Sequence, residues 1–262
     1  MRYVLQPKYL VEASTTGGIG IRQYGLEGLT PRSRAPHTAH RTPAEIVEKI
    51  LTLRREKNWC PIVIEGYLHK QGIRVGHTTI YRILKQAGLN NPLQTPRRRR
   101  SFKRWQRRHP NSLWQCDLKL VDARWLITIL DDHSRYVTAS EIFKEGTAEN
   151  VIWLFDKAIH EYSKPREILT DHGSQFWSVR KGESSFDTYC ESKRIKHILG
   201  GIGKPTTLGK IERWFRTYDQ EHARFQLHRK YIEYYNYERP HMALNYKTPA
   251  EIYFPNVPNV MG

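Results

Sequence analysis

The stretch Ile168-Leu169-Thr170-Asp171-His172-Gly173-Ser174-Gln175-Phe176 joins a short apolar run to a carboxylate and a turn. β-prone residues lead up to Asp171, and glycine follows two positions later, so the pattern predicts a buried strand that ends at an acidic side chain. A carboxylate at such a strand end suits a divalent-metal site, provided that other parts of the chain supply further oxygen ligands.

Two further carboxylates have comparable settings. Asp117 interrupts the β-prone run at 112–121, and Glu212 lies in the opening turn of an amphipathic helix. Oxygen ligands favour hard cations such as Mg²⁺. Two such ions, about 3.5–4 Å apart, can hold the attacking and leaving oxygens of a displacement at phosphorus. The alternative is ordinary surface charge, because the chain has 26 Asp and Glu residues and most carboxylates on any protein are solvated.

The residues around these carboxylates carry a family resemblance. Leu169-Thr170-Asp171-x-Gly173-Ser174-x-Phe176, followed by Gly209-Lys210-x-Glu212-Arg213, resembles the catalytic core of insertion-sequence transposases in the retroviral-integrase superfamily, the DDE group. The resemblance covers about residues 110–250 and keeps the order Asp, Asp, Glu. It implies that Asp117, Asp171 and Glu212 are catalytic residues and ligands of two Mg²⁺ or Mn²⁺ ions. No Ser, Tyr or Cys nucleophile is then needed.

The chain also departs from the family pattern. Forty residues separate Asp171 from Glu212, which is a longer gap than the family usually has, and residues 178–185 have the composition of a surface insertion. His172 and Leu208 each stand where the family usually has asparagine. His172 is either a group that supports the site or a packing residue.

The positive charge is concentrated in the first part of the chain. The net charge is +17, and residues 1–110 hold 22 Lys and Arg against 6 Asp and Glu, whereas residues 111–262 hold 21 against 20. A basic module favours a nucleic-acid partner. No run approaches the ~18 apolar residues of a membrane span, and no secretory signal is evident. Three scattered cysteines indicate neither a zinc site nor disulfides, so we expect a cytoplasmic, nucleoid-associated protein.

Residues 42–90 have the pattern of three short helices after an irregular N-terminal segment, 1–41, which the resemblance suggests is truncated. Helices are predicted to start at Thr42 or Pro43, at Pro61 and at His77, with threonine hydroxyls capping the third. The trio resembles a helix-turn-helix domain, and an ordinary helical bundle is the alternative. The candidate DNA contacts on its third helix are Thr78, Thr79, Tyr81, Arg82 and Lys85.

Residues 91–110 form a basic linker. A run of like charges stays extended until it meets a polyanion, and each phosphate contact makes binding more sensitive to salt. A solubilising tether is the alternative. The candidate phosphate contacts in the linker are Arg97, Arg98, Arg99, Arg100, Lys103 and Arg104. Those near the active site are Lys204, Lys210 and Arg213.

Residues 111–226 have an α/β pattern. The order of predicted elements, β-β-β-α-β-α-β-α, is that of the ribonuclease H-like fold with a mixed five-stranded sheet. Residues 227–262 are predicted to form a final helix and an extended arm, with tyrosines that pack in the core. The predicted strands are 112–121, 124–130, 135–143, 166–170 and 196–199, and the predicted helices are 147–162, 185–194 and 206–226, the last preceded by a glycine-rich loop at 200–209.

Three functional hypotheses follow. The first is a DNA transposase or integrase that binds element ends as at least a dimer and uses divalent metal ions to cleave and transfer DNA strands. The second is a catalytically decayed DNA-binding protein that occupies or represses its sites, which His172, Leu208 and the short N-terminal segment favour. The third is a ribonuclease H-like nuclease, against which the helix-turn-helix pattern argues.

Overall fold

The computed structural model describes residues 41–90, 105–177, 184–201 and 208–255. The chain divides into the units Met1–Pro43 and Ala44–Gly262, and almost all of the first lies outside the described residues. The predictions for residues 1–40, for the linker up to Arg104, for the insertion at 178–183 and for most of the loop at 200–209 also lie outside them. Within the described ranges, no helix has the length and apolar character needed to cross a membrane.

Three helices follow Pro43, as predicted: α2 (Ala44–Lys57), α3 (Pro61–Lys70) and α4 (His77–Gln86). Their apolar faces meet at Ile50, Ile64 and Leu84, which are fully buried. Pro61 occupies the start of α3, where its missing N–H leaves no hydrogen bond unmade. The predicted threonine cap of α4 is wrong, because Gly76 is the N-cap and makes no side-chain cap bond. Thr78 and Thr79 lie inside the first turn instead.

These helices share a core with the C-terminal part of the same unit. The Trp59 indole N–H donates a 2.6 Å hydrogen bond to the Tyr234 hydroxyl. The backbone of Gly66 lies so close to the Tyr246 ring that an added Cβ would come within 2.1 Å of it. Lys70 forms a 2.9 Å ion pair with Glu251. Apolar burial therefore continues from α2 and α3 into the tail of the chain.

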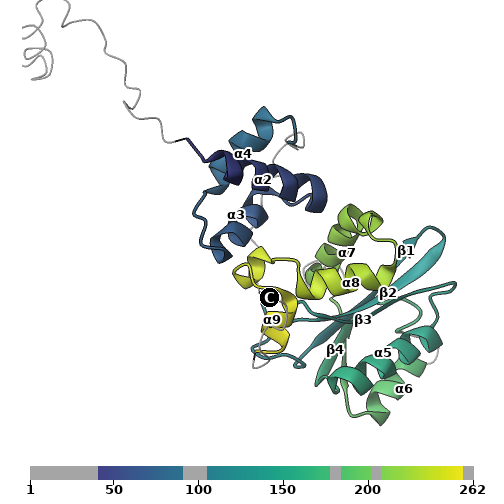
Figure 1. Cartoon of the computed structure of the whole chain (residues 1–262). Coiled ribbons are helices and arrows are strands. Elements are labelled where there is room, and N and C mark those ends of the chain that lie inside the picture. The colour runs from purple at the N-terminus through teal and green to yellow at the C-terminus, as the bar shows by residue number, and fades with distance from the viewer. Residues whose placement is uncertain (1–40, 91–104, 178–183, 202–207, 256–262) are drawn as a thin grey trace, which may run out of the picture. The chain divides into compact units, whose positions relative to one another are not determined.

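The centre of the unit is a mixed five-stranded sheet, as predicted (Figure 1). Its strands lie in the order β3-β2-β1-β4-β5. Strand β1 pairs antiparallel with β2 and parallel with β4, while β2–β3 is antiparallel and β4–β5 parallel. The bounds are β1 Trp114–Val121, β2 Arg124–Asp131, β3 Val137–Phe143, β4 Glu167–Thr170 and β5 Lys196–Leu199.

The third strand begins two residues later than the predicted Arg135. Asp131 Oδ1 accepts bonds of 2.7 Å from the Ser134 N–H and 2.6 Å from the Ser134 hydroxyl, and Arg135 adopts a φ of 65°. An aspartate that bonds the backbone ahead of it forms a turn. Asp131 therefore stabilises a turn that includes the residues expected to start the strand.

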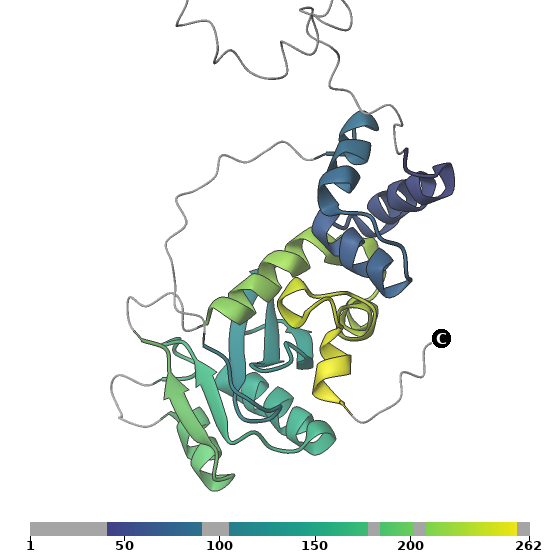
Figure 2. The same cartoon turned by 90° about the vertical axis from the view of Figure 1, so that its left-hand side faces the viewer.

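Helices cover both faces of the sheet (Figures 1 and 2). On one side lie α5 (Ala148–Tyr162) and α6 (Ser185–Ser192), and on the other lie α7 (Gly209–Glu221) and α8 (His228–Tyr237). Alternation along β1 directs Cys116 and Leu118 into the apolar cluster that α5 and α6 cover. Gln115 and Lys119 instead bond residues of α7. Asp117 lies two residues from each of them along β1, so its side chain points to the same face, the one that α7 covers.

The C-terminal segment differs from the predicted extended arm. After α8 and a short 3₁₀ turn at Met242–Leu244, the chain forms the helix α9 (Pro249–Tyr253). Thr248 and Glu251 make a capping box there, which satisfies two backbone N–H groups that a short helix would otherwise expose. The prediction that the tyrosines are core residues is confirmed for Tyr231, Tyr234 and Tyr235 of α8, which are buried, whereas Tyr237 at the end of that helix is exposed.

His241, between α8 and α9, lies in a cationic environment. Its Nε2 atom is buried and makes no hydrogen bond among the described residues. Burial, followed by the charges of Arg239, Arg135 and Arg213, holds the pKa of His241 well below its usual value. The folded protein therefore keeps this imidazole neutral, whereas the unfolded chain binds a proton near pH 6.5. Stability is unaffected above that pH and is lost as the pH falls below it.

We expect His241→Gln to reduce the acid sensitivity of the fold. Between pH 7 and 5 the wild-type free energy of unfolding should fall by up to about 1.4 kcal/mol per pH unit from this group alone. The variant should show a shallower fall in urea unfolding followed by circular dichroism. His109→Gln, at an exposed histidine, is the matched control. Equal slopes for His241→Gln and the wild type would contradict this account.

Candidate active site

The register of two neighbouring strands brings the first two predicted carboxylates together. Strand β1 pairs in parallel with β4, with Trp114 opposite Ile168 and Gln115 opposite Leu169. Continuing this register by two residues places Asp171, just beyond the end of β4, level with Asp117. Adjacent strands lie about 4.8 Å apart, and residues at one level of a sheet point to the same face. The register therefore directs both carboxylates to the side that α7 covers.

Glu212 approaches from α7. The apolar side chains of this helix, Ile211 and Trp214 among them, are buried, and they leave Glu212 exposed in the first turn. A carboxylate in that turn interacts favourably with the positive end of the helix dipole. Glu212 and Asp171 both act electrostatically on Asp117, so the fold brings the three carboxylates within range of one another.

Asp117 carries the electrostatic cost of this arrangement. Burial, reinforced by the charges of Asp171 and Glu212, raises the pKa of Asp117 to about 7, although the N–H of Leu118 donates a 2.8 Å bond to its Oδ1. Both effects disfavour the ionised form. A cation placed among the three groups would reverse the balance, because it favours ionised carboxylates.

Hydrogen bonds hold the Asp171 segment in place. Asp171 Oδ1 accepts the N–H of Gly173 at 2.9 Å. The buried Thr170 hydroxyl shares a 2.7 Å hydrogen bond with Nε2 of His197, whose Nδ1–H donates to Asp187. His172 Nε2–H donates to the carbonyl of Gly200 at 2.7 Å. This bond ties the ends of β4 and β5 together, so it fits the packing interpretation of His172.

The three carboxylates fit a hard divalent cation in donor type and in charge. Their oxygens are the ligands that Mg²⁺ prefers, and the charges of Asp171 and Glu212 add to the burial that raises the pKa of Asp117. Among the residues that the structure describes, no group of three His, Cys, Asp or Glu side chains is arranged closely enough to hold a metal ion. The three carboxylates thus lie within electrostatic range of one another, but their side chains are not arranged as a set of metal ligands.

The buried thiol beside Asp117 is not a competing nucleophile. Burial raises the pKa of the Cys116 thiol well above its usual value, and Asp117 and Asp171 raise it further. A thiol in this setting stays protonated, and the thiolate is the reactive form. The fold also directs Cys116 to the opposite face of the sheet from the carboxylates. The geometry therefore agrees with chemistry that uses no cysteine.

The predicted DNA contacts have different outcomes. Lys210 turns inward, where its ammonium pairs with buried Asp132 and its side chain is 16% exposed, so its predicted phosphate contact has no support. Arg213 is exposed, and Lys204 and the linker residues Arg97–Arg100, Lys103 and Arg104 lie outside the described residues. On α4, the residues Thr78, Arg82 and Lys85 are exposed, and Thr79 and Tyr81 are partly buried.

Two buried polar residues escaped sequence reasoning: Asp132, which pairs with Lys210, and Gln115, which bonds Asp132. The structure buries both side chains completely, and Gln115 Nε2 donates to Asp132 Oδ1 at 2.9 Å. One signal was available in the sequence: Gln115 precedes Asp117 by two residues and therefore shares its face of β1.

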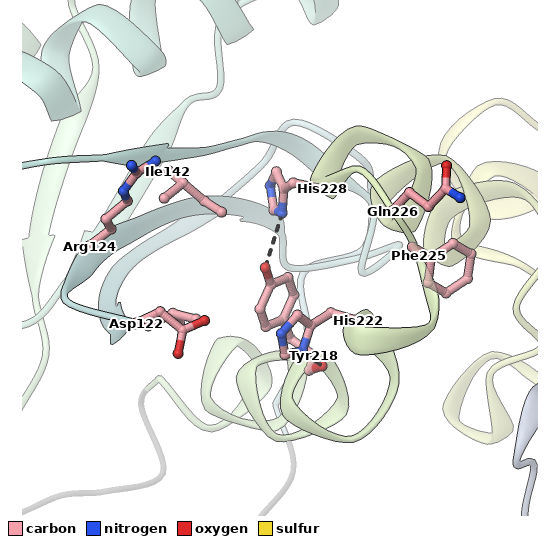
Figure 3. A pocket seen from close by; sticks show the side chains of 9 residues that line it. Asp122, Arg124, Ile142, Tyr218, His222, Phe225, Gln226 and His228 are labelled. Atoms are coloured by element: carbon pink, nitrogen blue, oxygen red, sulfur yellow. Dashed lines mark hydrogen bonds between the residues drawn. The ribbon is translucent and has the colours of Figure 1, made fainter.

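A separate pocket lies toward the β1–β2 turn (Figure 3). It has a volume of about 350 Å³, and none of the three carboxylates lines it. The His228 ring joins two elements there: Nε2–H donates to the Ser140 carbonyl at 3.2 Å, and Nδ1 accepts from the Tyr218 hydroxyl at 3.3 Å. The lining residues are Val121, Asp122, Arg124, Ile142, Tyr218, His222, Phe225, Gln226 and His228.

The sheet order, the helices on both faces and the carboxylates at the β1–β4 junction define a ribonuclease H-like α/β domain, preceded by helix-turn-helix helices. Two family models of the integrase core domain match residues 107–205 and 193–249. A family model of a homeodomain-like domain matches residues 21–84. The chain therefore contains an integrase core domain at residues 107–249.

Two curated relatives show this kinship. The transposase for transposon Tn552 of Staphylococcus aureus is 25% identical over 238 residues, which is 76% of this chain and 47% of that protein. This chain therefore aligns with about half of the length of that transposase. The uncharacterized 31.7 kDa protein of insertion element IS407 from Burkholderia multivorans is 26% identical over 72% of this chain and 73% of its own length.

Solved structures of integrases are also similar. The catalytic core domain of the HTLV-2 integrase in complex with magnesium is 26% identical, covers 56% of this chain and 98% of its own, and superposes with a TM-score of 0.41. A simian T-cell lymphotropic virus intasome in complex with a PP2A regulatory subunit is 20% identical over 81% of this chain and 76% of its own, with a TM-score of 0.49.

We expect Asp117→Asn to stabilise the metal-free protein at pH 8. The folded pKa of Asp117 lies above its unfolded value, so its ionised form destabilises the fold once the pH exceeds about 4, and this cost is fully present above pH 7. Removing the charge should raise the free energy of unfolding by roughly 2–4 kcal/mol. Thermal unfolding measures the gain.

The exposed turn residue Asp122 supplies the control, because Asn tolerates its φ of 47°. Asp122→Asn should leave the unfolding temperature nearly unchanged. Added Mg²⁺ should raise the unfolding temperature of the wild type more than that of Asp117→Asn, because ligand binding stabilises the folded state by mass action. A destabilised Asp117→Asn protein would argue against mutual repulsion at this site.

Proposed function

We propose that this protein is a DNA transposase that binds the ends of its own element and carries out metal-dependent strand cleavage and strand transfer. The observation that carries the proposal is the register of β1 and β4, which sets Asp117 level with Asp171, with Glu212 close enough to raise the Asp117 pKa. The match to the integrase core domain supports the same reaction class.

The proposed reaction is two successive displacements at phosphorus. In cleavage, a water oxygen bonds to phosphorus, the bond to the 3′-oxygen breaks, and a DNA 3′-hydroxyl is released. In transfer, that hydroxyl attacks a phosphodiester of the target, and the target's own 3′-oxygen leaves. Asp117, Asp171 and Glu212 would hold divalent ions, which when bound lower the pKa of the attacking hydroxyl and stabilise the leaving oxygen. The carboxylates orient the reacting groups without forming a covalent intermediate.

DNA binding is assigned to α4 and to the basic linker. Arg82 and Lys85 are exposed on α4, as a helix that enters a major groove requires. The first 110 residues carry nearly all of the net positive charge. Pairing two element ends requires at least two copies of the protein on DNA, so we propose a dimer or larger assembly in the bacterial cytoplasm, associated with the nucleoid.

A catalytically decayed, site-occupying protein is the second candidate. One observation favours it: no group of three metal-ligating side chains is closed among the described residues. A stand-alone ribonuclease H-like nuclease is less well supported, because residues 21–84 match a homeodomain-like domain. The following experiment separates the three.

We expect Asp171→Ala to abolish strand cleavage and joining. The substrate is a labelled duplex that carries the inverted repeats flanking the gene, with Mg²⁺ or Mn²⁺, and products are resolved on denaturing gels. Loss of one of three carboxylates should lower the rate by at least about 10³-fold, equivalent to about 4 kcal/mol of transition-state stabilisation. Asp122→Ala, in the hairpin turn, should keep the wild-type rate.

Each result identifies one candidate. Metal-dependent products that disappear in Asp171→Ala support the transposase. Specific binding of the repeats by the wild type, without products in either metal, supports the decayed protein. Hydrolysis of RNA–DNA hybrids in place of the duplex supports the nuclease.

We expect Arg82→Ala combined with Lys85→Ala to weaken DNA binding and reduce its salt dependence. Each lost phosphate contact should lower the slope of log K against log salt by about 1. Fluorescence anisotropy with the same duplex at several salt concentrations measures both effects. Arg55→Ala, at an exposed cation near the end of α2, should leave the slope unchanged. An unchanged slope in the α4 variant would remove α4 from the DNA interface.

A further inference from the structure

Asp132 is a fully buried carboxylate outside the three candidate catalytic residues. It lies directly after β2, and its two oxygens are bonded by three different segments of the chain. Oδ1 receives the Lys210 ammonium and the Gln115 side-chain amide. Oδ2 accepts the backbone N–H of Arg107 at 2.8 Å. A buried charge with this many specific partners is a structural junction, because any lost partner leaves part of the charge unsatisfied.

Two of the three partners belong to the elements that carry candidate catalytic carboxylates. Gln115 stands on β1 two residues before Asp117 and on the same face. Lys210 stands on α7 two residues before Glu212. Side chains two apart on a helix diverge by roughly 200°, so Lys210 reaches Asp132 while Glu212 leaves α7 in a different direction. The junction therefore connects the two elements without using either catalytic group.

Gln115 adds a second connection between β1 and α7. The first N–H groups of a helix have no partner inside the helix, and the N-cap of α7, Leu208, offers no side-chain bond. Gln115 Oε1 instead accepts the N–H of Ile211 at 3.3 Å. The Gln115 side chain thus caps the start of α7 with its Oε1 atom, while its Nε2 atom bonds Asp132.

The end of the basic linker completes the junction. Lys210 Nζ lies 4.8 Å from the centre of the Trp105 ring, and the Arg107 backbone bonds Asp132. Gln106 is fixed as well, because Arg135 donates a 2.8 Å bond to its Oε1. The last residues of the linker that precedes the sheet are therefore built into the same cluster as the start of α7.

We propose that Asp132 is a positioning residue that holds Glu212 opposite Asp117, through Lys210 and Gln115, with Trp105 and Arg107 closing the junction from the linker side. This inference rests on the proposed function for its catalytic consequence. Its structural content, that Asp132 fixes the start of α7 on β1, stands apart from any activity.

A second ion pair between the same two elements provides a matched control. Lys119 of β1 pairs with Asp219 of α7, and Asp219 is 48% exposed. Exposed pairs contribute little, because solvent screens them. Asp219→Asn removes one carboxylate charge from a β1–α7 contact, as Asp132→Asn does, but outside the junction. Because both variants lose one negative charge, any difference between Asp132→Asn and Asp219→Asn comes from where the charge was lost.

The test measures hydrogen exchange at the start of α7 and catalysis in parallel. In Asp132→Asn, amide exchange in a peptide that covers residues 208–215 should accelerate about tenfold or more, since the Ile211 amide loses its fixed acceptor. The rate constant kcat for strand transfer should fall about tenfold or more, an effect of about 1.4 kcal/mol. The Kd for element DNA should stay within about twofold, because α4 and the linker bind the DNA. Asp219→Asn should change none of the three.

Further variants keep the inference testable if Asp132→Asn folds poorly. Gln115→Met removes the acceptor of the Ile211 N–H while the Lys210 ammonium stays paired with Asp132, and it should also accelerate exchange at 208–215. Wild-type exchange in both variants would overturn the positioning role. Accelerated exchange with an unchanged kcat would show that Asp132 does not act through Glu212. If the wild type has no strand-transfer activity, the proposed function fails, while the exchange result still decides whether Asp132 anchors α7.

Discussion

The parallel pairing of β1 with β4 is the constraint on which the candidate site depends. It sets Asp171 level with Asp117, although 53 residues separate them in the chain. Because the strands are central, the bonds that align the carboxylates also bury Asp117, and burial together with the neighbouring charges raises its pKa to about 7. A slip by one residue would turn one carboxylate to the opposite face.

Asp117 and Asp132 are two acidic residues on the α7 side of the sheet whose charges are balanced to different degrees. Asp132 is compensated within the chain by the Lys210 ammonium and by amide donors. The charges that act on Asp117 include two more carboxylates. A protein tolerates such repulsion at a site where a cation binds, and strained electrostatics of this kind cluster at functional sites. The compensated carboxylate fixes the framework, and the uncompensated one is available for chemistry.

Several features were predictable because their signals are local. Strand alternation predicts that Cys116 and Asp117 point to opposite faces of the sheet. Apolar spacing predicts the helices α5 and α7, and the order of elements predicts the mixed sheet. The errors had local causes too. The Asp131–Ser134 bonds delayed β3, Gly76 replaced the expected threonine cap, and the Thr248–Glu251 capping box made a helix where an extended arm was expected. A side-chain bond to the backbone caused the first and the last of these differences, whereas Gly76 caps α4 without one.

By itself the sequence determined the types of elements, the concentration of positive charge in the first 110 residues and the identity of the candidate carboxylates, because periodicity, composition and motif spacing are properties of the chain. The tertiary structure alone decided which carboxylates stay uncompensated. Lys210 and Asp132 are 78 positions apart, and no local pattern links them. Their pairing follows from folding α7 across β1, which brings the Lys210 ammonium to the buried Asp132 carboxylate.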